Sequence, residues 1–168
     1  MRAFVLEDGP PKLVHDRPAP MPHDGLVRVR TRVAGICNTD LELARGYMGF
    51  HGVLGHEFVG DALDGALAGR RVVGAINFGC GRCARCVTGL ERHCSARRVL
   101  GILAADGTLA EEFLIPEKNL VEVPASVSDE TAVFAEPVAA AYEVLEQLGR
   151  VEATRVLVIG DGKLGPLV

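Results

Sequence analysis

Four closely spaced cysteines constrain this 168-residue chain more than any other feature. Their spacing is C-x2-C-x2-C-x7-C, formed by Cys80, Cys83, Cys86 and Cys94. Two-residue gaps let a tight turn aim two sulfurs at one point, and the longer gap returns the chain with a fourth. Four thiolates complete a tetrahedral shell, which is typical of structural zinc. The pattern therefore predicts a zinc lobe over residues 77–98, in preference to an iron centre, a redox pair or disulfides.

Composition excludes several other classes of protein. The chain has 24% charged residues and a net charge of −4, without a basic run that would indicate nucleic-acid binding. Its apolar stretches are too short to span a membrane. Glu7 and Asp8 come too early for a signal peptide, so we expect a cytoplasmic protein with reduced cysteines. The odd number of cysteines, five, also argues against complete disulfide pairing.

The first part of the chain predicts mainly β structure. Residues 26–37 alternate between apolar side chains on one face and Arg28, Arg30 and Arg32 on the other, which indicates a half-buried strand. The arginines could form an anion site, but an exposed strand face is the preferred interpretation. An antiparallel barrel or sandwich is expected from further short strands, which flank a turn at 9–11 and lie near 53–60, 70–76 and 109–115.

After Pro124 the pattern becomes helical. Ser128 is the predicted N-cap, followed by acidic residues that favour the positive end of a helix. Pro137 is expected to start or kink a second helical segment, and Gly149 to end it.

The final stretch, "VLVIGDGKLGPLV", places an apolar strand at 156–159 before a G-x-G-x-x-G motif. Gly160, Gly162 and Gly165 predict the pyrophosphate site of a dinucleotide-binding unit. Such a strand belongs inside a parallel sheet. Without its partners, we expect it to stay disordered or to pair with another chain.

A second, open metal site is suggested by Cys37, His56 and Glu136, because each residue type binds zinc and three ligands leave a position for substrate. Each also has a simpler interpretation, respectively as a buried apolar residue, a core histidine and a surface charge or cap. Glu136 precedes Pro137, which biases its backbone away from the helical conformation and favours a position at a helix N-terminus, where its carboxylate stays ionised. His56 and Glu57 lie on an expected strand, so their side chains should diverge.

The ordered set "GICNTD", "GHEFVG", "CGRCARCVTGLERHC", "AEP" and "GDGKLG" resembles the zinc-dependent medium-chain alcohol dehydrogenases, which include sorbitol and threonine dehydrogenases. The resemblance implies a mainly β fold. Residues 1–150 would form a GroES-like β-barrel with peripheral helices and the zinc lobe. Residues 151–168 would begin a truncated α/β Rossmann domain.

The resemblance also implies the role of each site residue. Cys37, His56 and Glu136 match the ligands of a catalytic zinc, and Glu57 matches a carboxylate that approaches the metal. Thr39 matches the hydroxyl that carries away the substrate proton, and Asp40 the carboxylate that orients the histidine. Alternatively, Thr39 and Asp40 only cap a helix that begins near Leu41.

The expected function is that of the N-terminal catalytic part of a zinc-dependent alcohol or polyol dehydrogenase, which transfers hydride to NAD or NADP. One catalytic and one structural zinc, a small-molecule alcohol substrate and a homo-oligomer are implied, with no nucleic acid or membrane partner. Because most of a nucleotide domain is missing from the sequence, we expect the chain alone to be inactive. The alternative is a non-catalytic zinc-binding module.

Overall fold

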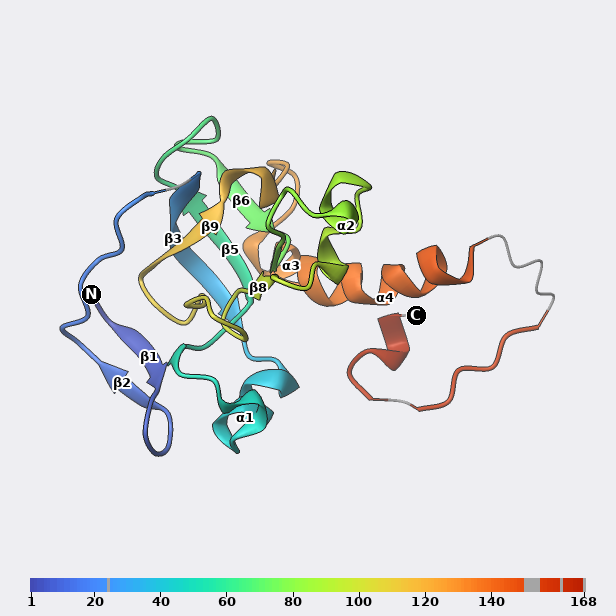
Figure 1. Cartoon of the computed structure of the whole chain (residues 1–168), viewed down its shortest axis with the longest axis horizontal. Coiled ribbons are helices and arrows are strands. Elements are labelled where there is room, and N and C mark those ends of the chain that lie inside the picture. Colours follow the sequence, from blue (N-terminus) through green and yellow to red (C-terminus); the bar gives the residue numbers. More distant parts are fainter. Residues whose placement is uncertain (24, 150–154, 161, 168) are drawn as a thin grey trace.

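The computed structural model describes residues 1–23, 25–149, 155–160 and 162–167. A five-stranded antiparallel sheet in the order β10-β6-β5-β3-β9 lies at the centre (Figure 1). Its strands, in that order, are Leu120–Glu122, Arg71–Gly74, Glu57–Ala62, Leu26–Gly35 and Glu112–Pro116. Two smaller sheets complete the β structure: β2-β1-β4 (Lys12–Val14, Ala3–Leu6, Gly52–Val53) and β7-β8 (Asn77–Phe78, Arg98–Val99).

Strand β3 confirms the alternation predicted from the sequence. Val27 and Val29 are buried, whereas Arg30 and Arg32 are exposed. The register shifts between Thr31 and Val33, a β-bulge that bends the strand after its regular first half. The arginines of this face form ion pairs with carboxylates, which favours the exposed-face interpretation over an anion site; the pairs are Arg28–Asp64, Arg30–Glu112 and Arg32–Asp61.

The main core lies between the central sheet and the segments that cross it. Phe58 of β5 and Phe113 of β9 meet edge to face, with ring centroids 4.8 Å apart. Around them pack buried aliphatic and aromatic side chains, namely Val27, Val29, Ala62, Val72, Phe78, Leu100, Ile115 and Leu120. This core fixes the strands whose ends carry the candidate metal ligands.

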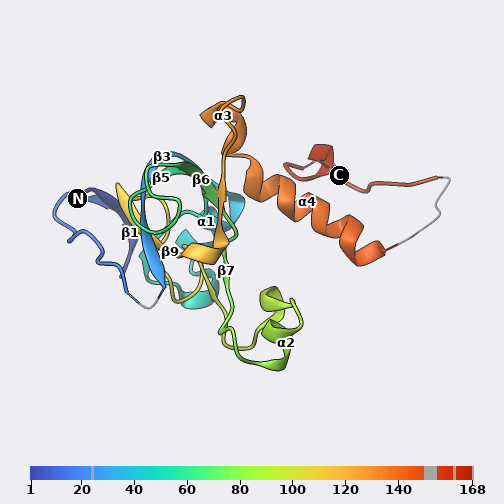
Figure 2. The same ribbon diagram turned by 90° about the horizontal axis from the view of Figure 1, so that it is seen from above.

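Short helices connect and flank the sheets: α1 (Asn38–Ala44), α2 (Ala84–Val87), α3 (Asp129–Ala132) and α4 (Ala135–Leu148). Single 3-10 turns lie at Tyr47–Gly49, Glu91–His93, Glu117–Asn119 and Gly165–Leu167. Figure 2 shows the lobe that carries α2 projecting from the sheets, and α4 extending beside the body. Within the described residues, no helix is long and apolar enough to cross a membrane.

The helical predictions after Pro124 are confirmed. Ser128 caps α3, because its hydroxyl accepts a hydrogen bond from the Thr131 N–H. Pro137 is the third residue of α4, where an N–H would have no helical partner and its absence costs little. Gly149 ends α4 with φ of 62°.

Two predicted features differ from the structure or fall outside it. The single strand expected near 53–60 is divided into β4 and β5, with a loop at 54–56 between them. The expected domain boundary at 150 and 151 lies outside the described residues.

The apolar tail has no strand partner in the described part of the chain. Residues 155–160 carry no regular secondary structure, and Leu157 and Ile159 are 83% and 91% exposed. The expectation that this segment stays disordered or pairs with another chain stays a prediction.

Substitution of Gly101 tests its close packing against Gly55 in the loop at 54–56. It has φ of 63°, and a Cβ there would collide with the Gly55 carbonyl, whereas Gly69, with φ of 78°, faces open space. We expect Gly69→Ala to lower the free energy of unfolding by about 1–2 kcal/mol through backbone strain alone. Gly101→Ala should cost about 1–3 kcal/mol more, because overpacking adds to the strain. Urea unfolding measures both, and equal losses would contradict the packing argument.

Candidate metal centres

The four cysteines of the lobe converge on one point. The Sγ atoms lie 3.9 Å apart for Cys80 and Cys86, 3.5 Å for Cys83 and Cys86, and 3.8 Å for Cys83 and Cys94. Zinc–sulfur bonds of about 2.3 Å place the sulfurs of a tetrahedral site about 3.8 Å apart. A disulfide would require a sulfur separation of about 2.0 Å, and all five cysteines are free. The lobe therefore has the dimensions of a closed zinc shell, formed with Cys94 rather than the neighbouring His93.

The backbone of the lobe favours ionised sulfur. N–H groups of Arg82 and Cys83 donate to Cys80 and lower the pKa of its thiol to about 6. The Cys86 N–H likewise lowers the pKa of Cys83. Burial raises the pKa of Cys86 to about 12, so this thiol ionises only when a cation compensates its charge. This donor set fits a divalent metal ion, since a metal both requires and stabilises thiolates.

A second cluster forms where β3 ends and β5 begins. Cys37, His56 and Glu57 offer ligand atoms that lie within 4.8 Å of one another. Cys37 follows β3 and serves as the N-cap of α1, while Glu57 is the first residue of β5. The antiparallel register sets Gly35 opposite Glu57. A Cβ at Gly35 would collide with the Glu57 carboxylate, so the glycine provides the space that this side chain occupies.

The prediction that His56 and Glu57 diverge is wrong. Alternation of side chains holds only within a strand, and β5 begins at Glu57. His56 lies in the loop after Gly55, whose φ of 96° turns the chain. Both side chains consequently reach the cluster with Cys37.

Asp40 ties the two segments of this cluster together. Its carboxylate accepts hydrogen bonds from the Cys37 N–H at 2.8 Å and the Gly55 N–H at 3.0 Å. Its Oδ1 also lies 3.6 Å from Nδ1 of His56, slightly beyond hydrogen-bond distance. Asp40 is only 3% exposed, so these contacts are shielded from water.

The alternative that Thr39 and Asp40 merely cap a helix near Leu41 needs revision. Helix α1 begins earlier, at Asn38, because the Cys37 N–H finds its acceptor in the Asp40 side chain. Asp40 therefore contributes to capping from inside the first turn and also faces His56. Thr39 is half-buried, with Oγ1 3.7 Å from Cys37 Sγ.

The surroundings of His56 favour a positive charge. The side chain is buried, and its Nδ1 has no hydrogen-bond partner among the described residues. Burial lowers the pKa of His56, but Asp40 and Cys37 raise it further, to about 9. The cluster thus holds excess negative potential around a buried nitrogen, which fits a site for a cation.

Glu136 lies near this cluster but not within its tightest group. It occupies the first turn of α4 and is half-buried. Burial raises the pKa of Glu136 above its ordinary value; nearby His56 lowers the pKa by less, and nearby Glu57 adds to the rise. This direction is opposite to the one expected for a carboxylate at a helix N-terminus. The group of ligand atoms within 4.8 Å, as far as the described residues go, comprises Cys37, His56 and Glu57 without Glu136.

The backbone of Glu136 differs from the sequence-based expectation, whereas the position of Glu57 does not. Glu136 is helical although a proline follows it, because Pro137 stands where the helix needs no N–H. Glu57 lies among the candidate ligands, where a carboxylate that approaches the metal is expected, and its role stays a prediction. Gly35 in the facing strand was the available clue, but only the register connects it to Glu57.

Within the described part of the predicted nucleotide motif, a turn lies at residues 163 and 164, before the 3-10 turn Gly165–Leu167. Gly160 has φ of 111°, and the Gly165 N–H donates to the Gly162 carbonyl at 3.1 Å. A Cβ at Gly165 would approach the Gly160 carbonyl. The glycines therefore allow close backbone contacts, as a phosphate loop requires.

Comparison with known proteins supports the same family. The model of the alcohol dehydrogenase GroES-like domain matches residues 23–125. This chain belongs to the zinc-dependent medium-chain alcohol dehydrogenase family. The mainly β fold with a GroES-like domain, predicted from the sequence, is thereby confirmed.

Its relatives are named dehydrogenases, reductases and a sensing protein. Over 98% of its length it is 34% identical to the starvation-sensing protein RspB of Escherichia coli (strain K12), covering 51% of that protein. It is 31% identical to the probable D-xylulose reductase A of Aspergillus fumigatus, covering 98% of this chain and 50% of the relative. An alcohol dehydrogenase structure from E. coli CFT073, complexed with NADH, superposes with a TM-score of 0.89 at 34% identity, covering 99% and 51% of the two chains. The chain thus spans about half the length of these relatives.

The buried Asp40 carboxylate yields a prediction about stability. Asp40→Ala leaves the Cys37 and Gly55 N–H groups without their acceptors, and each unmet buried group costs about 1–3 kcal/mol. Asp40→Asn keeps one acceptor oxygen and should lose less. Urea unfolding of the metal-free chain measures the difference, and equal stability of the alanine variant and the unmodified chain would contradict these contacts.

Proposed function

We propose that this chain forms the catalytic, metal-binding part of a dehydrogenase that oxidises a small alcohol or polyol with NAD or NADP. The observation that carries the proposal is the presence of two different thiolate centres in one member of the alcohol dehydrogenase family. One is a closed shell of four cysteines, and the other is an open cluster of Cys37, His56 and Glu57. A closed shell serves structure, whereas an open one leaves a position for substrate.

Two zinc ions are the proposed metals. Cys80, Cys83, Cys86 and Cys94 would hold the structural ion. Cys37, His56 and Glu136 would hold the catalytic ion, with Glu57 close enough to exchange with a ligand. The convergence of the Cys37 sulfur, the His56 ring and the Glu57 carboxylate, together with the negative charge that raises the pKa of His56 to about 9, supports a cation at this place. When bound there, zinc would supply Lewis acidity toward the substrate hydroxyl.

The residues around the cluster have proposed roles of their own. Thr39, with its hydroxyl 3.7 Å from Cys37 Sγ, would accept the substrate hydroxyl proton and release it toward solvent. Asp40 would keep His56 oriented, since its carboxylate is itself fixed by the Cys37 and Gly55 N–H groups. These side chains would position the alcohol and take up its hydroxyl proton, and a bound nicotinamide would supply the hydride acceptor.

Cofactor and substrate class rest on likeness to relatives. The E. coli CFT073 structure contains NADH, and the Aspergillus relative is named for D-xylulose, a ketose whose reduction gives a polyol. Gly160, Gly162 and Gly165 would contribute to the pyrophosphate site.

The lobe gives a prediction about bound metal. The purified chain should contain two zinc ions, and Cys83→Ser should retain only one and unfold at lower temperature, because the closed shell loses a ligand. His93→Ala, beside the lobe but outside its cluster, is the matched control and should retain both ions. Elemental analysis and thermal unfolding measure these outcomes. Full zinc content in Cys83→Ser would contradict the four-cysteine assignment.

The open cluster gives the prediction that tests the function. Cobalt added to the chain with zinc in the lobe should produce a Cys37 thiolate-to-cobalt absorption band, and a small alcohol or polyol should alter the cobalt spectrum. His56→Ala should lose the band, whereas His51→Ala, which changes an exposed histidine, should keep it.

A chain that binds metal only in the lobe would support the alternative of a non-catalytic zinc-binding module. A cobalt spectrum that no alcohol perturbs would oppose the proposed open coordination position. Either result would contradict the dehydrogenase proposal without affecting the assignment of the lobe.

A further inference from the structure

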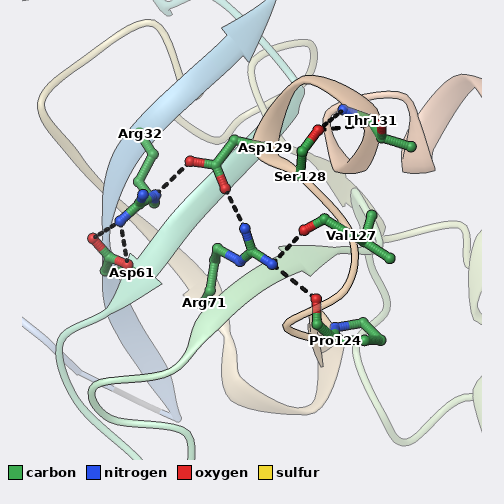
Figure 3. A network of polar contacts seen from close by, with 8 residues as sticks. All are labelled: Arg32, Asp61, Arg71, Pro124, Val127, Ser128, Asp129 and Thr131. Atoms are coloured by element: carbon green, nitrogen blue, oxygen red, sulfur yellow. Dashed lines mark hydrogen bonds and ion pairs between the residues drawn. The ribbon is translucent and has the colours of Figure 1, made fainter.

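A network of charged groups connects the segments that carry the candidate ligands (Figure 3). Arg32 of β3 donates from Nε to Asp129 Oδ2 at 2.7 Å and from Nη1 to Asp61 Oδ1 at 3.3 Å. Arg71 of β6 donates from Nη1 to Asp129 Oδ1 at 2.8 Å. Asp129, the first residue of α3, thus uses each carboxylate oxygen for a different arginine.

Arg71 also fixes the chain that leads into α3. Its Nη2 donates to the Pro124 carbonyl at 2.8 Å and to the Val127 carbonyl. The Arg71 and Asp129 side chains are 23% and 16% exposed, so this pair is better shielded than most ion pairs of the molecule. Charge-assisted contacts of a planar guanidinium restrain direction as well as distance.

The path from Asp129 to Glu136 is short and hydrogen-bonded. The Val133 N–H donates to the Asp129 carbonyl at 3.0 Å, and the Phe134 N–H to the Thr131 carbonyl at 3.2 Å. Helix α4 begins directly afterwards, at Ala135. Because this hydrogen-bonded turn leads directly into α4 without an intervening loop, the position of Asp129 constrains the position of Glu136.

The strands of the network also carry the other ligands. Arg32 lies five residues before Cys37 on the strand that leads to it, and Asp61 lies on β5, which begins at Glu57. The network therefore links the segments of Cys37, Glu57 and Glu136 to one another. Apolar contacts of Ala132 and its neighbours also attach α3 to the sheet, but such contacts are non-directional.

We propose that Asp129, held between Arg32 and Arg71, is a positioning residue that sets Glu136 at ligand distance from the catalytic metal. The inference rests on the proposed function, in which Glu136 is a zinc ligand. Ligand distances in such a site tolerate deviations of only about 0.2 Å. Apolar packing attaches the α3–α4 segment, and the directional ion pairs of Asp129 would restrain its orientation so that Glu136 can reach the metal.

The test is the affinity for cobalt at the open cluster of the full 168-residue chain, with zinc already in the lobe. Asp129→Asn keeps the size of the side chain but removes its charge, and should weaken cobalt binding about tenfold, as loss of a supporting contact does at other metal sites. Asp64→Asn is the matched control, since it removes the comparable ion pair to Arg28 at 3.0 Å without touching α3. It should leave cobalt binding unchanged.

A double-mutant cycle separates positioning from general destabilisation. In a Glu136→Gln background, Asp129→Asn should cause no further loss of cobalt affinity, because its effect acts through Glu136. An undiminished loss in that background, or equal losses from Asp129→Asn and Asp64→Asn, would overturn the inference while leaving the proposed function intact. If Glu136→Gln itself leaves cobalt affinity unchanged, then Glu136 is no ligand, and both the inference and the proposed ligand set are overturned.

Discussion

The antiparallel pairing of β3 with β5 is the constraint on which the candidate site depends. Its register sets Gly35 opposite Glu57, so the end of one strand lies beside the start of the next. Strand pairing thereby brings Cys37 and His56, which are distant in sequence, close together. The bulge between Thr31 and Val33 lies between the regular, well-buried part of β3 and this end. Core packing of Val29 and Phe58 stabilises the pairing of β3 with β5. This pairing in turn sets the positions of the candidate ligands.

Closely spaced acidic groups and sulfurs are the second feature on which the two candidate metal centres depend. Asp40 is almost fully buried beside His56, and the lobe gathers four sulfurs within a few ångströms. Such arrangements are costly unless a cation balances them. The two centres differ in the number of ligand atoms that they bring together, since the lobe offers four sulfurs whereas the open cluster offers one sulfur, one imidazole and one carboxylate. The proposed function rests on this difference rather than on either centre alone.

The sequence predicted the strands and helices more reliably than the residues at which they begin, end and connect. The strands at Ala3–Leu6 and Leu26–Gly35 and the Ser128 cap followed from local patterns and are confirmed. The division of the region near His56 into two strands was missed, because a positive φ at Gly55 leaves no trace in hydrophobic alternation. The helical state of Glu136 was missed because the restriction before proline is only a preference, which the first turn of α4 overrides.

By itself, the sequence determined the four-cysteine lobe, since short spacings bring those sulfurs together in almost any fold. It also determined the alternation of β3 and the residue types available for an open metal site. Only the tertiary structure decided that Glu57 joins Cys37 and His56, and that Asp129 connects two arginines from separate strands. Contacts between distant segments depend on strand register and core packing, which local composition does not encode.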